Sequence, residues 1–334
     1  MERPDTPIQV FTAGEALIDM IRQADGRYAA CLGGAVYNLT RALSRQGVGT
    51  AYLNPLSQDD LGQQLASQLL ADGVTLAQPT PVHESTAMAV VGLDANGHPS
   101  YSFYRQGVAD RCVDATTMNQ QTESYPALKI VATGCLALAP EDASHYLPWL
   151  QRQRELGKAV VVDANVRLSA MRDVAAYRQN VLSAVGLAHI VKASDEDLDA
   201  LQIAGDTPLA KARTLLASSG AHLFVLTLGA QGACLINRAG QVWQAREAAP
   251  VDAVDTVGAG DCFLAGLLAA LLHAGPDPLS TIAALDEATA HALLKHALSS
   301  ASINVMRSGC VPPTWDEVSS RVAEIQYEFG GFGR

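Results

Sequence analysis

A glycine-rich turn beside a single acidic residue is the strongest candidate for chemistry in this sequence of 334 residues. Gly258-Ala259-Gly260 precedes Asp261, and eleven uncharged, mostly apolar residues follow, from Cys262 to Leu272. This run predicts a buried helix with Asp261 in its first turn. Two glycines let the backbone turn sharply and expose its amides at the helix N-terminus, which carries about half a positive charge and attracts anions.

Asp261 has two interpretations. An aspartate near a helix start commonly caps the helix. A carboxylate beside an anion-binding turn can instead accept a proton from an alcohol while the amides stabilise a transferring phosphoryl group. The backbone entropy that the two glycines cost and the apolar character of the helix favour the second interpretation. This pattern therefore predicts phosphoryl transfer to a hydroxyl.

The composition narrows the range of partners. The net charge is −11 and no cluster of Lys or Arg is present, so nucleic acid and anionic membranes are poor partners and a small solute is a better one. The N-terminal stretch MERPDTPIQVF lacks the basic and apolar segments of a signal peptide, so we expect a cytoplasmic protein without a membrane span. Six cysteines without a C-x-x-C pair predict reduced, mostly buried thiols, and eight dispersed histidines do not suggest a metal site.

The elements that must position this turn alternate between strand and helix patterns, which predicts a mainly parallel sheet covered by helices. Four short apolar runs are typical of buried parallel strands: KIVATG, AVVVDAN, HIVKAS and LFVLTLG, beginning at Lys129, Ala159, His189 and Leu223. Two amphipathic helices are expected to end before a glycine: one carries Val36, Leu39 and Leu43 before Gly47, and the other carries Leu61, Leu65 and Leu69 before Gly73.

One stretch breaks this alternation. Residues 86–93 and 100–105 flank Asp94-Ala95-Asn96-Gly97, a turn signal that predicts a hairpin. Together with residues 13–30 it is expected to form a small sheet outside the main layer. This sheet is either a peripheral hairpin or a lid over the edge where open α/β sheets bind ligands, and both interpretations are open. It also offers an edge and a face for a homodimer, so we expect either a monomer or a homodimer.

Two common nucleotide-binding motifs are missing from the sequence. It contains no G-x-x-x-x-G-K-[ST] and no early G-x-G-x-x-G, so a P-loop enzyme and a nicotinamide oxidoreductase are disfavoured. The segment DTVGAGDCF, residues 255–263, instead resembles the C-terminal signature of the ribokinase (PfkB) family of carbohydrate kinases. Further similar segments follow the family order over nearly the whole chain: GEALIDM from Gly14, GGAVYN from Gly33, DDLG from Asp59, FYRQGVAD ending at Asp110, DANVR from Asp163, KASDED from Lys192 and TLGAQGA from Thr227.

The resemblance implies a fold and a reaction. The GEALIDM, FYR and DANVR segments are most similar to the fructokinase branch. The expected fold is a single ribokinase-like α/β kinase domain over residues 1–334, doubly wound and mainly parallel, with helices on both faces and a β-sheet lid from about 13–30 and 86–110. The expected reaction is ATP-dependent phosphorylation of a sugar, first of all D-fructose to fructose 6-phosphate. Kinases of 2-keto-3-deoxygluconate or of a riboside or nucleoside are open alternatives, and so is a catalytically silent sugar- or nucleotide-binding protein.

The resemblance also implies roles for individual residues. Asp261 is expected to be the general base, with the amides of Gly258, Ala259 and Gly260 as the anion hole. The acceptor sugar is expected to contact Asp19, Gly33, Gly34, Asn38 and Arg105, and the transferred phosphate Asn165 and Arg167. The residues expected around the nucleotide are Lys192, Ser194, Thr227, Gly229, Gly232, Gly258 and Gly260.

The resemblance finally implies bound metal ions, and the sequence departs from the family pattern at the two places described here. Ser194 to Asp197 stands where the family has N-x-x-E, so Asp197 is expected to hold Mg²⁺ through water, although S-x-x-D is also a good helix-capping pattern. Asp255 and carbonyls of residues 307–310 are expected to hold K⁺. Tyr37 and Thr40 replace smaller or apolar residues, which predicts a reshaped sugar pocket.

Overall fold

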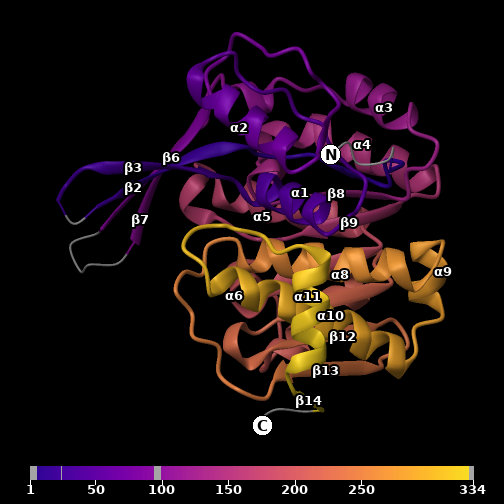
Figure 1. The fold of residues 1–334 in the computed structure, drawn as a ribbon. Helices are drawn as coiled ribbons and strands as arrows, with labels where there is room; N and C mark the ends of the chain where they lie inside the picture. Colours follow the sequence, from indigo (N-terminus) through magenta and orange to yellow (C-terminus); the bar gives the residue numbers. More distant parts are fainter. Residues whose placement is uncertain (1–5, 24, 94–98, 331–334) are drawn as a thin grey trace.

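The computed structural model describes residues 6–23, 25–93 and 99–330. Their strands form two separate sheets, one of ten strands and one of four (Figure 1). The order in the large sheet is β14-β13-β12-β11-β10-β9-β8-β1-β4-β5. Its strands are β1 (Val10–Thr12), β4 (Thr50–Tyr52), β5 (Thr75–Leu76), β8 (Ile130–Gly134), β9 (Ala159–Asp163), β10 (Ile190–Ser194), β11 (Leu223–Thr227), β12 (Ala233–Asn237), β13 (Val242–Glu247) and β14 (Tyr327–Phe329).

The large sheet is mainly parallel, as predicted. Neighbouring strands from β5 to β11 all pair in parallel, and β12, β13 and β14 continue the sheet in antiparallel fashion. The four apolar runs identified in the sequence form β8, β9, β10 and β11, which are neighbours in chain order. In a parallel sheet the carboxyl ends of such strands share one edge, where ligands commonly bind.

Helices cover both faces of this sheet, because successive side chains of a strand point to opposite faces. In β9, Val160 and Val162 pack in one buried cluster with Trp149 of α4, whereas Val161 packs in another with Leu268 of α8. The helices are α1 (Ala35–Arg45), α2 (Asp60–Ala71), α3 (Ala115–Glu123), α4 (Ala143–Glu155), α5 (Val174–Leu187), α6 (Asp195–Ala200), α7 (Pro208–Ser218), α8 (Ala259–Ala274), α9 (Pro278–Ala283), α10 (Glu287–Val305) and α11 (Trp315–Glu324).

The small sheet projects from the side of the body (Figure 1). It has the order β3-β2-β6-β7, with β2 (Leu17–Arg22), β3 (Tyr28–Gly33), β6 (Ala87–Leu93) and β7 (Pro99–Tyr104). The predicted hairpin pairs β6 with β7 in antiparallel fashion, and its turn at 94–97 lies outside the described residues. Only residues 13–16 separate β1 of the large sheet from β2 of the small one. The two sheets therefore meet at a short, buried connection.

Two further expectations concern the membrane and the cysteines. In the part of the chain that the structure describes, no helix is long and apolar enough to cross a bilayer. All six cysteines are free thiols. Cys135, Cys234 and Cys262 are buried, but Cys31 and Cys112 are exposed, so the prediction of mostly buried thiols is correct for only half of them.

Candidate active site

The carboxylate of Asp261 does not cap its helix. Helix α8 begins after Gly258, its N-cap, so Asp261 is the third residue of the helix, and no hydrogen bond from its first amides to the Asp261 carboxylate is found among the described residues. Asp261 is 7% exposed, and its Oδ2 accepts a hydrogen bond of 3.0 Å from Nδ2 of Asn38 on α1. Its position in the first turn therefore serves a contact between two distant helices, which agrees with the chemical interpretation of the sequence rather than the capping one.

The surroundings of Asp261 favour its protonated form. Burial, and then the negative charge of Asp163, raise the pKa of Asp261 from its ordinary value of 3.8 to about 7. The Asn38 hydrogen bond, Lys192 and Arg167 act in the opposite direction. A carboxyl group with a pKa near 7 exchanges protons readily at neutral pH, which suits a general base.

Asp163 and Lys192 form a buried ion pair beside Asp261. Nζ of Lys192 donates to both carboxylate oxygens of Asp163, at 2.8 and 2.9 Å. Both side chains are almost completely buried, at 4% and 8% exposure. Lys192 also lies under the glycine turn, because a Cβ atom added to Gly260 would come within 3.3 Å of Nζ. The pair therefore places one fixed positive charge directly behind the start of α8.

The glycine turn is required by close packing. Gly258 has φ +75°, and a Cβ atom added there would overlap Sγ of Cys310. The amide of Ala259 donates to the carbonyl of Thr256 at 3.2 Å, so it is already engaged in the turn. The expected anion hole from the amides of Gly258, Ala259 and Gly260 stays a prediction.

The predicted sugar-contacting residues at the start of α1 lie together. Gly34 has φ +108°, and a side chain there would overlap the carbonyl of Glu15. A side chain on Gly33 would overlap the carboxylate of Asp19 on β2. Burial raises the pKa of Asp19 to about 6. The turn therefore unites Asp19, the two glycines and Asn38, and we call these four residues the cradle.

Tyr37 and Thr40 point into the core instead of the sugar pocket. Tyr37 is fully buried and donates to the carbonyl of Leu65, and Thr40 donates to the carbonyl of Val36. Neither residue lines the cavity beside Asp261. The prediction that these two side chains reshape the pocket is wrong, because the helical period turns positions 37 and 40 away from it.

A small cavity connects the cradle side of Asp261 to the carboxyl ends of β8 and β9. Its volume is about 10 Å³. Two of the residues that enclose it, Cys135 with φ +52° and Asn165 with φ +36°, have backbone conformations that side chains other than glycine rarely adopt. Such strain is concentrated at functional sites. The residues that line the cavity are Ala35, Val36, Leu39, Thr133, Gly134, Cys135, Asp163, Asn165 and Asp261.

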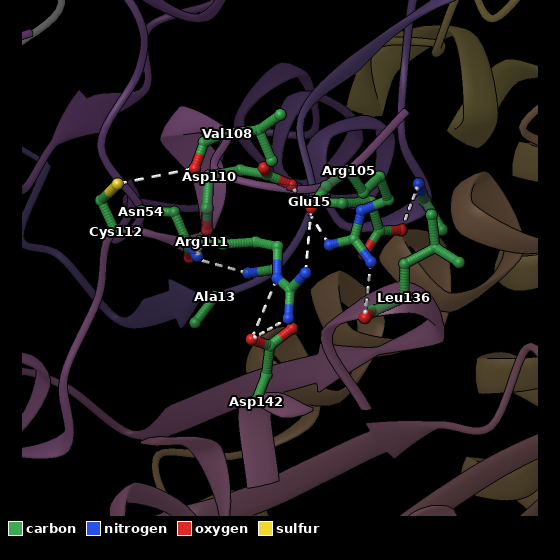
Figure 2. Close-up of polar contacts among 12 residues, drawn as sticks. Ala13, Glu15, Asn54, Arg105, Val108, Asp110, Arg111, Cys112, Leu136 and Asp142 are labelled. Carbon is green, nitrogen blue, oxygen red and sulfur yellow. Dashed lines mark hydrogen bonds and ion pairs between the residues drawn. The ribbon is translucent and has the colours of Figure 1, made fainter. Parts of the chain in front are cut away.

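Arg105 lies at the end of β7 in a buried cluster of charges (Figure 2). Its guanidinium donates to the carbonyl of Leu136 at 3.0 Å and to Oδ2 of Asp110 at 3.4 Å. Leu136 follows Cys135, which lines the cavity. The structure thus places Arg105 next to the enclosing loop, with only 10% of its side chain exposed.

The remaining predicted residues differ in their exposure to solvent. Arg167 is exposed, but its positive charge is close enough to lower the pKa of Asp261. At the end of β11, Thr227 is half-buried and Gly229 is exposed, so both are accessible to a ligand. Gly232 is buried, and a side chain there would overlap the carbonyl of Ala245 on β13. Close packing against β13 is therefore sufficient to require a glycine at this position. A contact of Gly232 with nucleotide stays a prediction.

Ser194 and Asp197 form a capping box at the start of α6. The Ser194 hydroxyl accepts from the amide of Asp197, and Oδ2 of Asp197 accepts from the amide of Ser194 at 2.8 Å. Oδ1 of Asp197 accepts from the amide of Val166 at 2.7 Å. Both oxygens of this buried carboxylate are engaged, so Asp197 does not fit a direct Mg²⁺ ligand. A contact through water stays a prediction.

Asp255 joins the glycine turn to the C-terminal loop. Its Oδ1 accepts from the amide of Val257 at 3.0 Å, and its Oδ2 accepts from the amide of Gly309 at 2.9 Å. The structure thus brings the carboxylate together with residues 307–310. Both carboxylate oxygens of Asp255 are engaged by amides, as in Asp197, so a K⁺ site at Asp255 and the carbonyls of residues 307–310 stays a prediction.

Three side chains of this site were given no role in the sequence analysis. Asp163 stands in the DANVR segment, but only the fold shows its ion pair with Lys192. Glu15 accepts from the amide of Ala35 at 2.9 Å, and its signal was an acidic residue between a glycine and an apolar run. Cys310 has no local signal, because its contact with Gly258 joins segments 52 residues apart.

Comparison with known proteins agrees with this geometry. The profile of the pfkB family carbohydrate kinases matches residues 8–317. The chain is 31% identical to a fructokinase of Rhizobium leguminosarum bv. trifolii over 83% of this chain and 84% of that one. It is 28% identical to an aminoimidazole riboside kinase of Salmonella typhimurium, over 88% and 86%.

A solved structure shows the same fold. It is the fructokinase of Xylella fastidiosa with bound ATP, which superimposes with a TM-score of 0.81 at 25% identity, over 96% of this chain and 99% of that one. The ribokinase-like fold expected from the sequence is confirmed. With the family profile covering most of its length, this chain belongs to the pfkB family of carbohydrate kinases.

Proposed function

We propose that this chain is a fructokinase that transfers the γ-phosphoryl group of ATP to the 6-hydroxyl of D-fructose. The observation that carries the proposal is the placement of Asp261, which is buried, bonded to Asn38 of the cradle and located in the first turn of α8. The relative from Rhizobium leguminosarum and the ATP-bound neighbour from Xylella fastidiosa, both named fructokinases, support this substrate and this phosphoryl donor. The whole chain, residues 1–334, acts as one kinase domain in this proposal.

In the proposed reaction Asp261 accepts the proton of the acceptor hydroxyl. The hydroxyl oxygen forms its bond to the γ-phosphorus as the bond between that phosphorus and the leaving ADP breaks. Amides at the start of α8, with Gly258 and Gly260, provide donors for the phosphoryl oxygens. Arg167 adds positive charge near the transferred phosphate in this proposal, and Asn165, which lines the cavity beside Asp261, lies near the same group.

The acceptor binds in the cradle in this proposal. Asp19 accepts hydrogen bonds from sugar hydroxyls, and the glycines let the ring approach the backbone closely. The small sheet acts as a lid, and its residue Arg105 closes the acceptor side of the site. Thr227 and Gly229 contact the nucleotide, whereas Lys192, Ser194 and Gly232 shape its site from behind.

Two cations complete the proposal. Mg²⁺ on the nucleotide would supply positive charge against the phosphates, and Asp197 would contact it through water. Asp255 and carbonyls of residues 307–310 would hold K⁺. Asp255 holds the loop of residues 307–310 against the glycine turn through its two amide hydrogen bonds.

ADP release across a panel of acceptors tests the proposal. The panel contains D-fructose, D-glucose, D-ribose, 2-keto-3-deoxygluconate and aminoimidazole riboside, each with ATP and Mg²⁺. We expect the highest kcat/KM with D-fructose and formation of fructose 6-phosphate. No ADP release with any acceptor, together with measurable sugar binding, would support a silent binding protein.

A second candidate is a riboside kinase. The 28% identity to an aminoimidazole riboside kinase over 88% of the chain favours it, because acceptor choice depends on the pocket and not on the phosphoryl-transfer residues. A kcat/KM for aminoimidazole riboside above that for fructose in the same panel would select this candidate. The catalytic role of Asp261 would be the same in both.

A further inference from the structure

Glu15 lies in the connection between the two sheets and is 1% exposed. Its Oε1 accepts a hydrogen bond of 2.9 Å from the amide of Ala35. Ala35 is the first residue of α1 and directly follows Gly33 and Gly34. One oxygen of Glu15 therefore fixes the start of the helix that carries Asn38 and holds the two glycines of the cradle in place.

The second oxygen of Glu15, Oε2, is buried and has no strong hydrogen-bond donor among the described residues. The side-chain donor that acts on this carboxyl group is the Cys135 thiol, a weak donor that lowers the pKa of Glu15. Figure 2 shows Glu15, Arg105 and Asp110 gathered in one cluster, and each of the two charges of Glu15 and Arg105 stabilises the other. Nε of Arg105 is likewise buried without a hydrogen-bond partner among the described residues.

The charges of this cluster do not balance. Two guanidinium groups, Arg105 and Arg111, face three carboxylates, Glu15, Asp110 and Asp142. Arg111 is bound firmly, since it donates to Oδ1 of Asp142 at 2.8 and 3.0 Å. Arg105 has a single, long contact of 3.4 Å to Asp110. Asp110 therefore holds Arg105 weakly, the carbonyl of Leu136 accepts a further hydrogen bond of 3.0 Å from its guanidinium, and Glu15 is the second carboxylate whose charge acts on it.

We infer that Glu15 is a positioning residue that couples the cradle to Arg105: one oxygen fixes the amide of Ala35, and the charge of the carboxylate orients the guanidinium. The inference rests on the proposed function, in which the cradle and Arg105 bind the acceptor from opposite sides. Glu15 links these two sides through a single side chain, so the cradle and the end of the lid hairpin are ordered together.

Glu15→Gln separates the two roles, because its amide oxygen still accepts from Ala35 but its charge is gone. We expect the KM for the accepted sugar to rise at least about tenfold, while kcat and the KM for ATP stay within about twofold. Asp142→Asn is the matched control: it removes one carboxylate charge from the same cluster, but at Arg111, and should change the sugar KM less than about twofold. A sugar KM that is unchanged in folded Glu15→Gln, or that rises equally in both variants, would overturn the inference.

Hydrogen exchange of the protein without ligands gives a readout that does not need activity. In Glu15→Gln we expect faster exchange in residues 105–111 and unchanged protection of the Ala35 amide, and in Glu15→Ala faster exchange at both places. Wild-type exchange at 105–111 in both variants would overturn the inference. Absence of kinase activity in the wild type would refute the proposed function and leave this exchange comparison to decide on Glu15.

Discussion

Asn38 on α1 donates a hydrogen bond of 3.0 Å to Asp261 on α8, across 223 residues of sequence. The contact ties the cradle to the proposed general base. Oδ1, the oxygen of the same Asn38 side-chain amide, is buried and has no hydrogen-bond partner within the described ranges. Asn38 therefore has an acceptor left for a sugar hydroxyl while its amino group orients Asp261.

Asp261→Asn should abolish most of the turnover. General-base catalysis contributes about 10²–10⁴-fold, so we expect kcat to fall at least about 100-fold. Removing a buried charge should leave the melting temperature unchanged or raised, because the carboxylate does not cap α8. Measurement of kcat and melting temperature on one preparation checks this. A folded variant that keeps more than about a tenth of the activity would exclude Asp261 as the base.

The pH dependence should reveal Asp261 in two ways. Because its pKa in the folded protein is about 7, kcat should rise with pH and level off above about pH 7. The folded state holds this proton over a range in which the unfolded state, with a pKa near 3.8, has lost it. The stabilisation is therefore complete below the unfolded pKa and is lost as pH rises through about 7. Melting temperatures against pH should show this loss in the wild type and not in Asp261→Asn.

Arg105→Ala should impair sugar binding and also stability. The KM for sugar should rise with little change in the KM for ATP, because we propose that Arg105 lies on the acceptor side. Its loss removes the 3.4 Å ion-pair contact of the buried Asp110 carboxylate, so the free energy of unfolding should also fall. Steady-state kinetics and urea unfolding of the same sample test both effects. A variant whose ATP KM rises alone contradicts the assignment.

Gly258→Ala should be inactive or nearly so. The added Cβ atom would overlap Sγ of Cys310, and the φ of +75° costs about 1–3 kcal/mol for a side chain. Gly240→Ala is the matched control, since Gly240 has φ +84° and open space around the added atom. Comparable activity of the two variants would show that the turn tolerates movement.

Potassium should activate the enzyme relative to choline at equal ionic strength. The expected site lies where Asp255 accepts amide hydrogen bonds from Val257 and Gly309. These bonds connect the C-terminal loop to the turn that precedes α8, so a cation that stabilises the loop should also stabilise this turn. Asp255→Asn should reduce the activation ratio. Equal rates in potassium and choline for the wild type would remove the cation from the proposal.

The sequence predicts those parts of the molecule that depend on local patterns. Strands β8 to β11 and the helices that end before Gly47 and Gly73 could be predicted from the hydrophobic pattern and from the residues that end each element. The sequence predicted roles for Asn38 and Asp261 separately, from two segments that resemble the family, but it did not predict their contact. The ion pair of Asp163 with Lys192 and the packing of Cys310 on Gly258 depend on how distant segments meet, which no local pattern contains.

The cavity beside Asp261 has a volume of about 10 Å³, which is room for about one water molecule. A hexose does not fit in such a space, so if the acceptor reaches Asp261 through this cavity, we expect the enclosing elements to separate first. The rate at which the sugar binds next to Asp261 is then limited by the opening of these elements. In stopped-flow mixing, the observed binding rate should approach a plateau at high sugar concentration, and that plateau is the opening rate. A rate that stays linear in sugar would mean that the acceptor meets an already open enzyme.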